Sequence, residues 1–318
     1  MHDLKLYLKD DLMRVAALVE QSLSTDIGLL EKCNRHILAH SGKMVRPMLT
    51  LLMARAVSGH SGEDTIRFAA AAELIHNATL LHDDVADDAS SRRGAETISS
   101  MLGPRPSVLL GDFWLVKGIA RILDGEKNSA RVMRLFGKTL SDLAEGEMLQ
   151  LELAGTGATS QEDYLRVIYD KTATLFETSA LAGAVSEGAS VPQEEAAASF
   201  ARNLGLAFQI KDDILDYVGG EALGKPAGQD LRERKITLPL LGAMANKPSE
   251  ESEARARVLK MDVEWLRSFV FENGGIEYAS AAVKDRLAKA VAVLDAFRDG
   301  PAKGFLVQLA DYVGERNY

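Results

Sequence analysis

The chain has 318 residues, 47% of them apolar, and its 37 basic and 46 acidic residues give a formal net charge of −9 at pH 7. This acidic balance argues against nonspecific nucleic-acid binding. Cys33 is the only cysteine, which excludes an internal disulfide and favours a reducing compartment. Because no apolar run approaches about eighteen residues and the N-terminus lacks the apolar core of a signal peptide, we expect a cytoplasmic protein without a transmembrane segment.

Apolar residues recur at intervals of three and four along almost the whole chain, without a sustained two-residue alternation, which predicts an all-α protein. Because no linker separates two cores, we predict a single domain over 1–318. Ser160 followed by Asp163 predicts a helix cap. The expected helices are 3–22, 25–39, 46–58, 64–87, 105–124, 128–153, 161–187, 193–218, 235–246, 250–272, 275–297 and 302–315.

Three aspartates stand close together at the end of the predicted helix 64–87. On a helix, Asp83 and Asp87 lie one turn apart with Asp84 at the edge of the same face, and His76 lies two turns back. The rest of this helix is so apolar that we expect it to be buried. Unpaired buried charge is costly, so a cation should face these carboxylates. The alternative interpretation is a solvated acidic helix end.

A second acidic cluster repeats the pattern Asp-Asp-x-x-Asp at Asp212, Asp213 and Asp216. With Gln209 these side chains form one polar stripe on the predicted helix 193–218. Two such clusters predict a shared metal site. Carboxylates alone select hard cations such as Mg²⁺, Mn²⁺ or Ca²⁺, and the sequence has neither a zinc pattern nor an EF-hand loop. Magnesium usually combines one or two carboxylates with substrate phosphates, so we expect a phosphorylated substrate.

Basic residues that could bind such phosphates occur in or next to predicted loops. They are Lys43, Arg46, Arg92, Arg93, Lys171, Lys225 and Lys235. The alternative for any one of them is a solvated surface cation. The sequence has no Walker-type glycine loop and no dinucleotide fingerprint, so a nucleotide is not indicated.

Together these motifs resemble the trans-type polyprenyl diphosphate synthases, and most of all their long-chain, octaprenyl-type members. The resemblance spans essentially the whole chain and depends on the order and spacing of several short motifs. These are Gly42-Lys43-x-x-Arg46-Pro47, His76 ahead of His82-Asp83-Asp84-x-x-Asp87, Arg92-Arg93-Gly94, Leu110-Gly111-Asp112-Phe113, Gly146-Glu147, Lys171-Thr172, Phe208-Gln209-x-x-Asp212-Asp213-x-x-Asp216, Gly224-Lys225-Pro226 and Lys235-x-Thr237-Leu238-Pro239.

The resemblance implies an antiparallel α-helical bundle around a central cavity, usually in a homodimer. By this resemblance Mg²⁺ binds the allylic diphosphate, with three ions in the substrate complex, and Mn²⁺ can substitute for it. The metal ligands would be Asp83, Asp84, Asp87, Asp212, Asp213 and Asp216. The resemblance assigns contacts with the same diphosphate to Arg92, Lys171 and Lys225, and isopentenyl diphosphate binding to Lys43, Arg46, His76 and Arg93. Gln209 and Thr172 would line the reacting end, and Lys235 would reach the allylic diphosphate during closure.

The implied reaction is successive condensation of isopentenyl diphosphate with an allylic diphosphate, farnesyl or geranylgeranyl diphosphate. In the resembling family, the helix before the first motif also walls the tunnel for the growing chain, and aromatic residues four or five positions before the first Asp close it. Here those positions hold Thr79 and Ala78, with Ala72 and Ala71 deeper along the helix. Small residues there predict a long-chain all-trans product. The alternative is that they only allow close helix packing.

Departures from the family pattern concern fine positioning: Met44 replaces a common cation, Arg234 a frequent glycine, and Pro104 and Pro106 stand in a loop that is commonly Gly-Asn. Three rival functions stay open. A short-chain farnesyl or geranylgeranyl diphosphate synthase would share all the motifs. A class I terpene cyclase usually has a different second motif, and a noncatalytic partner subunit commonly lacks motif aspartates. Transient membrane contact during product release is also left open.

Overall fold

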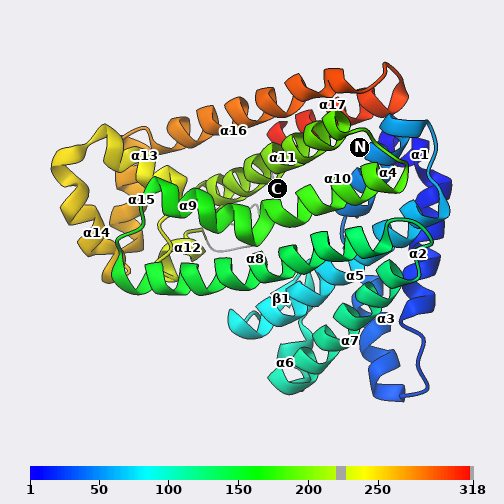
Figure 1. Ribbon diagram of the computed structural model, residues 1–318. Helices are drawn as coiled ribbons and strands as arrows, with labels where there is room; N and C mark the ends of the chain where they lie inside the picture. The colour runs from blue at the N-terminus through cyan, green and yellow to red at the C-terminus, as the bar shows by residue number, and fades with distance from the viewer. Residues whose placement is uncertain (220–226, 316–318) are drawn as a thin grey trace. The chain divides into compact units, whose positions relative to one another are not determined.

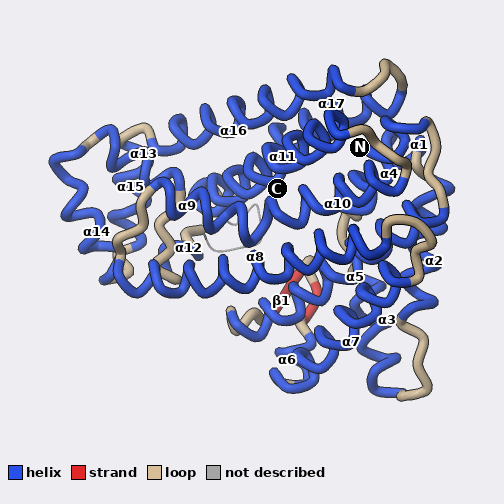
Figure 2. Tube along the Cα trace, viewed as in Figure 1, coloured by secondary structure: helices blue, strands red, loops and turns tan. Residues whose placement is uncertain are grey.

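The computed structural model describes residues 1–219 and 227–315, and nearly all of them lie in helices (Figures 1 and 2). The prediction of an all-α protein is confirmed. The chain divides into two compact units, one of residues 1–137, 178–197 and 297–306 and the other of 138–177, 198–296 and the C-terminal residues from 307 on. The single domain over 1–318 stays a prediction. No helix in the described ranges combines the length and apolarity needed to cross a membrane.

The first unit contains the N-terminal helices and a short hairpin. Four helices, α8 (Ser129–Thr156), α10 (Thr174–Ser186), α11 (Val191–Val218) and α17 (Pro301–Glu315), contribute residues to both units. The elements wholly within the first unit are α1 (His2–Tyr7), α2 (Lys9–Ser22), α3 (Gly28–Ala39), α4 (Val45–Ser58), α5 (Glu63–Ala86), β1 (Ser91–Arg92), β2 (Ala95–Glu96), α6 (Ile98–Leu102) and α7 (Pro104–Leu123).

Helix α5 forms the buried centre of the first unit. Its residues from Phe68 to Ala72 have no exposed surface, and α2, α4 and α7 pack against it. The helices approach closely: a Cβ atom added to Gly118 of α7 would lie only 2.7 Å from Ile75 Cγ1. Each large apolar side chain buried here stabilises the fold by about 1.5–3 kcal/mol. The C-terminal end of α5, which carries the first acidic motif, is therefore held in place by the packing of the rest of the helix.

A β-hairpin and a short helix between α5 and α7 were not expected from the sequence. The strands β1 and β2 pair antiparallel, with Arg92 opposite Ala95, and Arg93 and Gly94 at the turn both have positive φ. Helix α6 follows, and its N-cap Thr97 accepts the backbone N–H of Ser100 through its side chain. Short polar turns of this kind have neither a helical nor an alternating pattern of apolar residues, so hydrophobic periodicity does not predict them.

The second unit contains the remaining helical elements. Within it, α13 packs against both α15 and α16. The elements are α9 (Gln161–Ile168), η1 (Tyr169–Ala173), α12 (Gln229–Arg232), α13 (Leu238–Asn246), η3 (Pro248–Glu250), α14 (Glu251–Leu259), α15 (Val263–Glu272), α16 (Gly275–Ala292) and η4 (Val293–Ala296).

Several of the helix boundaries predicted for the C-terminal half of the sequence were wrong. The expected helix 250–272 is interrupted at Met261, whose φ is 55°, and Asp262 caps α15 by accepting the Trp265 N–H. The expected helix 161–187 contains one π-helical segment, η1. Helix α13 begins at Leu238 and not at residue 235, because Thr237 is extended and Pro239 occupies the first turn. The predicted cap is confirmed: Ser160 and Asp163 form a reciprocal capping box.

Candidate active site

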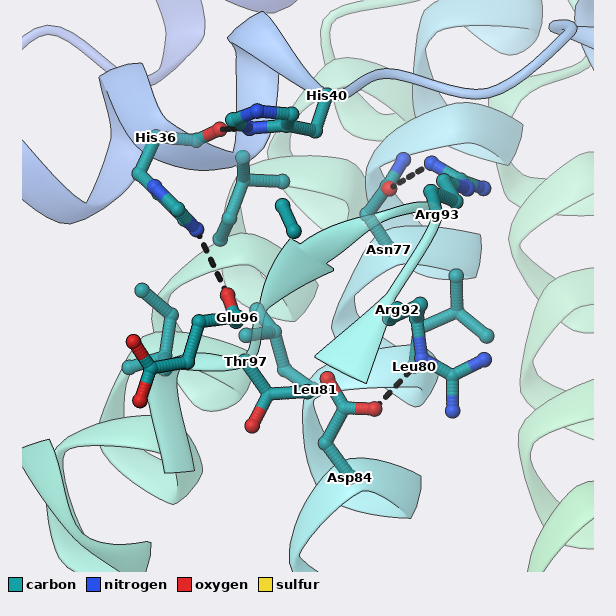
Figure 3. Close-up of a pocket in the computed structure, with 13 residues that line it drawn as sticks. His36, His40, Asn77, Leu80, Leu81, Asp84, Arg92, Arg93, Glu96 and Thr97 are labelled. Atoms are coloured by element: carbon teal, nitrogen blue, oxygen red, sulfur yellow. Dashed lines mark hydrogen bonds and ion pairs between the residues drawn. The ribbon is translucent and has the colours of Figure 1, made fainter. Parts of the chain in front are cut away.

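The first acidic motif lies where α5 ends. Asp83 is partly exposed and Asp87, the C-cap residue, is exposed, whereas Asp84 is turned into the protein and only 5% exposed. Arg92 Nε of the hairpin donates to Asp84 Oδ1 over 2.6 Å (Figure 3). Two carboxylates of the motif are thus at least partly exposed, and the third holds Arg92.

A cationic group surrounds His76 on the same helix. Burial and the guanidinium groups of Arg46, Arg93 and Arg92 lower the pKa of His76 well below its usual value, so the imidazole is neutral at pH 7. Lys43, also assigned to this group, is exposed. The arginines supply the positive charge here, while neutral His76 can offer a hydrogen bond to an anion.

Two polar residues that motif reading passed over lie beneath these arginines. Glu73 is 5% exposed, and Asn77 Nδ2 donates to its Oε1 over 3.1 Å. Arg93 Nη1 in turn donates to Asn77 Oδ1 at 3.5 Å (Figure 3). Burial raises the pKa of Glu73, and Asn77, Arg46 and Arg93 oppose that rise. Two polar side chains one turn apart on an otherwise apolar helix are a signal by which sequence reasoning could have found them.

The loop before α4 lies directly against Arg93. A Cβ atom placed on Gly42 would lie 2.6 Å from Arg93 Nη2 and 2.7 Å from its Cζ, so a side chain here would require the guanidinium to move. Met44, which follows in the same loop, has a left-handed φ of 55°. Gly42, the first residue of the motif Gly42-Lys43-x-x-Arg46, therefore lies against Arg93. The assignment of this motif to one anion site stays a prediction.

In the second unit, Lys171 and Thr172 lie in the π-helical segment η1. Close approach by neighbouring helices holds this segment: a Cβ atom on Gly146 of α8 would lie 2.7 Å from Asp170 Cβ, and one on Gly205 of α11 would lie 2.7 Å from Ala173 Cα. Lys171 forms an ion pair with Glu147 of α8. Isolated π-helical turns inside α-helices occur frequently at functional sites. Here the π-helical segment contains two predicted site residues.

The second acidic motif lies near the end of α11. Asp213 is 4% exposed, and both of its oxygens accept hydrogen bonds, Oδ2 from Tyr164 Oη at 2.6 Å and Oδ1 from Gln209 Nε2 at 2.8 Å. The two oxygens of Asp216 accept the backbone N–H groups of Gln229 and Asp230 at the start of α12. Asp212 is partly exposed. Nothing in the sequence spacing linked Tyr164 to this motif.

Negative charge is concentrated around this motif. Burial raises the pKa of Asp213 to about 7, with Asp212 and Asp216 acting in the same direction and Tyr164 and Gln209 against it. Burial, Asp213 and Asp216 together raise the pKa of Asp230 well above its usual value. Adjacent carboxylates that resist ionisation are a donor set that a hard divalent cation suits. In residues 1–219 and 227–315, no group of three or more His, Cys, Asp or Glu side chains is arranged to hold a metal ion by itself.

Of the two lysines predicted for the site after the second motif, the structure describes only one. Lys235 lies before α13, and its Nζ forms an ion pair with Glu233. Lys225 lies outside the described residues. The structure thus groups Arg46, His76, Asp84, Arg92 and Arg93 within the first unit, and Thr172, Gln209 and the second acidic motif within the other.

The small residues proposed to wall a tunnel lie on α5 as expected. Ala71 and Ala72 have no exposed surface and Ala78 is 1% exposed, while Thr79 is partly exposed and its Oγ1 donates to His76 O over 2.8 Å. A Cβ atom on Gly118 of α7 would lie 3.4 Å from Ala71 O. Close helix packing accounts for Ala71, and the tunnel role of the group stays a prediction.

Comparison with known proteins places this chain among its relatives. The polyprenyl synthetase family model matches residues 27–265. The octaprenyl diphosphate synthase of Escherichia coli is 36% identical over 313 residues, which is 96% of each chain.

Two solved structures show the same fold. A decaprenyl diphosphate synthase from Rhodobacter capsulatus has a TM-score of 0.93, 37% identity and complete coverage of both chains. A polyprenyl synthase from Caulobacter crescentus, complexed with calcium and isoprenyl diphosphate, has a TM-score of 0.91 and 36% identity over 99% of this chain and 97% of its own. The chain belongs to the polyprenyl synthetase family.

Proposed function

We propose that this protein is a trans-prenyltransferase that elongates an allylic diphosphate, farnesyl or geranylgeranyl diphosphate, with isopentenyl diphosphate to a long-chain all-trans polyprenyl diphosphate, releasing diphosphate. The observation that carries the proposal is the retention of every aspartate of both Asp-Asp-x-x-Asp motifs in a family member. Relatives named for octaprenyl and decaprenyl products support the long chain. A short-chain isoprenyl diphosphate synthase among the relatives keeps the shorter product as the alternative.

The carboxylates of both motifs would hold Mg²⁺ on the allylic diphosphate. Bound Mg²⁺ would neutralise the negative charge that develops on the leaving diphosphate. The calcium and isoprenyl diphosphate in the Caulobacter crescentus relative support a divalent cation at such a substrate. Three ions in the substrate complex and substitution by Mn²⁺ belong to the same proposal. The carboxylates concerned are Asp83, Asp84, Asp87, Asp212, Asp213 and Asp216.

Isopentenyl diphosphate would bind at the cationic group of the first unit. Arg46, Arg93 and Lys43 would pair with its phosphates, and neutral His76 would hydrogen-bond to them without adding charge. The buried pair Glu73 and Asn77 would keep Arg93 in place, since Asn77 accepts from Arg93 and donates to Glu73.

The allylic diphosphate would be held by Arg92, Lys171, Lys225 and Lys235, with Thr172 and Gln209 at the reacting carbon. Loss of diphosphate leaves an allylic carbocation, which the double bond of isopentenyl diphosphate attacks. A proton then leaves to the released diphosphate and restores the alkene. This chemistry requires no protein nucleophile.

The same proposal extends to the protein's setting. We propose a homodimer in the cytoplasm that contacts a membrane only transiently when the apolar product leaves.

The purified chain, given farnesyl diphosphate and labelled isopentenyl diphosphate, should incorporate label only when magnesium is added. Chromatography of the dephosphorylated products should then show a long-chain alcohol. Label incorporation distinguishes this function from terpene cyclisation, and turnover by the chain alone distinguishes it from a partner subunit. A product of three or four units would establish the short-chain alternative.

Replacement of one motif carboxylate tests the metal assignment. Asp83→Ala should lower turnover by about 100-fold or more, because charge on the leaving group would lose its stabilisation. Asp299→Ala removes a carboxylate that is 98% exposed and lies outside both motifs, and it should leave turnover unchanged. Helical circular dichroism should be the same for all three proteins. Full activity of Asp83→Ala at saturating magnesium would contradict the metal role.

A further inference from the structure

A row of hydrogen bonds connects α9, η1 and α11 within the second unit. Tyr164 Oη on α9 donates to Asp213 Oδ2 at 2.6 Å, and Gln209 Nε2 donates to Asp213 Oδ1 at 2.8 Å. Thr172 Oγ1 of η1 then donates to Gln209 Oε1 at 2.8 Å. These hydrogen bonds therefore connect Tyr164, which has no assigned role, to Gln209 and Thr172, which are assigned to the reacting end.

The directions of these bonds fix the Gln209 amide in one orientation. Its oxygen accepts from Thr172 and its nitrogen donates to Asp213, and a flipped amide would lose the contact with Asp213 and place its oxygen against the carboxylate. Asp213 can accept from Gln209 and Tyr164 together because a carboxylate oxygen has two lone pairs and each donor uses a different oxygen. A further contact at each oxygen remains open to a cation.

Burial makes the tyrosine contact specific. Tyr164 is 3% exposed and Asp213 is 4% exposed, so water cannot readily replace the phenol hydroxyl. The hydroxyl also accepts a hydrogen bond from the Leu238 backbone N–H, which helps to hold it beside Asp213. Carboxylates that bind metal ions are commonly oriented by such outer hydrogen bonds.

We propose that Tyr164 is a positioning residue for prenyl transfer, which orients Asp213 for magnesium–diphosphate binding and, through Gln209, orients Thr172 at the reacting end. The proposal rests on the function proposed above. Tyr164 itself contacts neither substrate, and it acts only through Asp213.

The test compares two tyrosine hydroxyls that each form a hydrogen bond involving α9: Tyr164, which lies on α9, and Tyr278, which bonds to it. Tyr164→Phe removes the bond to Asp213 together with the bond from the Leu238 backbone, whereas Tyr278→Phe removes a bond of 2.9 Å to Gln161 Oε1 of α9, a residue outside the acidic motif. Calorimetric binding of an unreactive allylic thiodiphosphate is measured at increasing magnesium concentration. For Tyr164→Phe the magnesium concentration at half-maximal binding should rise about tenfold or more, and for Tyr278→Phe it should stay at the wild-type value.

A double variant tests whether Tyr164 acts through Asp213. The Asp213→Ala variant should itself weaken magnesium-dependent binding, and adding Tyr164→Phe should cause little further loss, because the carboxylate that accepts from Tyr164 is already gone. The KM for isopentenyl diphosphate should change by less than about twofold in each variant, while kcat falls, which separates positioning from general damage.

Several outcomes would overturn the proposal: equal behaviour of Tyr164→Phe and Tyr278→Phe, or fully additive losses in the double variant. If Tyr164→Phe loses its helical circular dichroism, Asp213→Ala still tests these hydrogen bonds, and normal magnesium-dependent binding by that variant would refute the proposal. Failure of the proposed function gives a different result, since the wild-type chain would then not condense isopentenyl diphosphate at all.

Discussion

At the scale of single residues, charge patterns were informative and hydrogen-bond partners were not. The clustered aspartates and the arginines around His76 could be selected from the sequence because their charges are conspicuous at helical spacing. Tyr164 could not, because it lies 49 positions from Asp213 and its neighbourhood reads as an ordinary helix start. A buried hydroxyl gains its role from a partner that only tertiary packing supplies.

Gly42 gives a residue-scale prediction about the isopentenyl diphosphate site. In Gly42→Ala the new Cβ would lie 2.6 Å from Arg93 Nη2, so the guanidinium must move. We expect the KM for isopentenyl diphosphate to rise about tenfold, equivalent to roughly 1.4 kcal/mol, with little change in the KM for the allylic substrate. Steady-state kinetics with each substrate varied in turn measures both constants.

The matched control is Gly28→Ala, because nothing lies within 4 Å of a Cβ atom at that position. Its kinetics should equal those of the wild type. A rise confined to the allylic KM in Gly42→Ala would show that Gly42 and Arg93 serve the other substrate.

At the scale of elements, hydrophobic periodicity predicted the long apolar helices but did not predict the breaks and irregular turns within them. Helix α5 was predicted within one residue at each end, since its buried run is flanked by clear polar signals. The π-helical segment η1 is set by the close approach of Gly146 and Gly205 from other helices, so no local pattern around Lys171 could reveal it. The break at Met261 likewise depends on a left-handed residue that is not a glycine.

Asp64, in the first turn of α5, gives an element-scale prediction about pH. Its Oδ1 accepts from Arg67 Nη1 and the Glu126 N–H, and its Oδ2 accepts from the Lys127 N–H at 2.7 Å. Burial acts to raise its pKa, but these three donors outweigh burial and the pKa lies below its usual value. The folded state therefore gains stability from this carboxylate above about pH 4, and loses it as the pH falls through the folded pKa.

Asp64→Asn should lower the free energy of unfolding by about 1.5–3 kcal/mol at pH 7, because bonds to a charged acceptor are lost. The difference from the wild type should shrink as the pH falls below about 4, where the wild-type carboxyl becomes protonated. Guanidinium unfolding followed by circular dichroism from pH 7 to pH 3 measures it. The 98% exposed Asp299, changed to Asn, should show no such trend. A constant difference at every pH would rule out a role for the charge.

At the scale of the whole molecule, the family and its chemistry were predictable because they depend on motifs spread over most of the chain. The length of the product was harder to predict from the sequence, because it depends on how much apolar volume the folded helices leave for a growing lipid. The burial of Ala71, Ala72 and Ala78 is as consistent with tight packing of α5 as with a tunnel wall. Thr79 is the most exposed of the four positions and is the site at which the two interpretations separate.

Thr79→Phe should therefore shorten the product if α5 walls the tunnel. A phenyl ring at a partly exposed position can extend without overpacking the core, whereas Ala78→Phe would force a large ring into a site that is 1% exposed and destabilise the protein by roughly 1–3 kcal/mol. Chromatography of dephosphorylated products from Thr79→Phe should show the three- or four-unit class in place of the long chain. Val191→Phe adds the same ring at a position that is 68% exposed and should leave the product length unchanged.

Because Thr79 also bonds to His76 O, the KM for isopentenyl diphosphate must be measured in the same variant. A higher KM with an unchanged product length would mean that Thr79 supports the cationic group and does not face the growing chain. A shorter product at an unchanged KM would separate the two roles of α5, since the acidic end and the cationic group would then work normally on a chain that stops early.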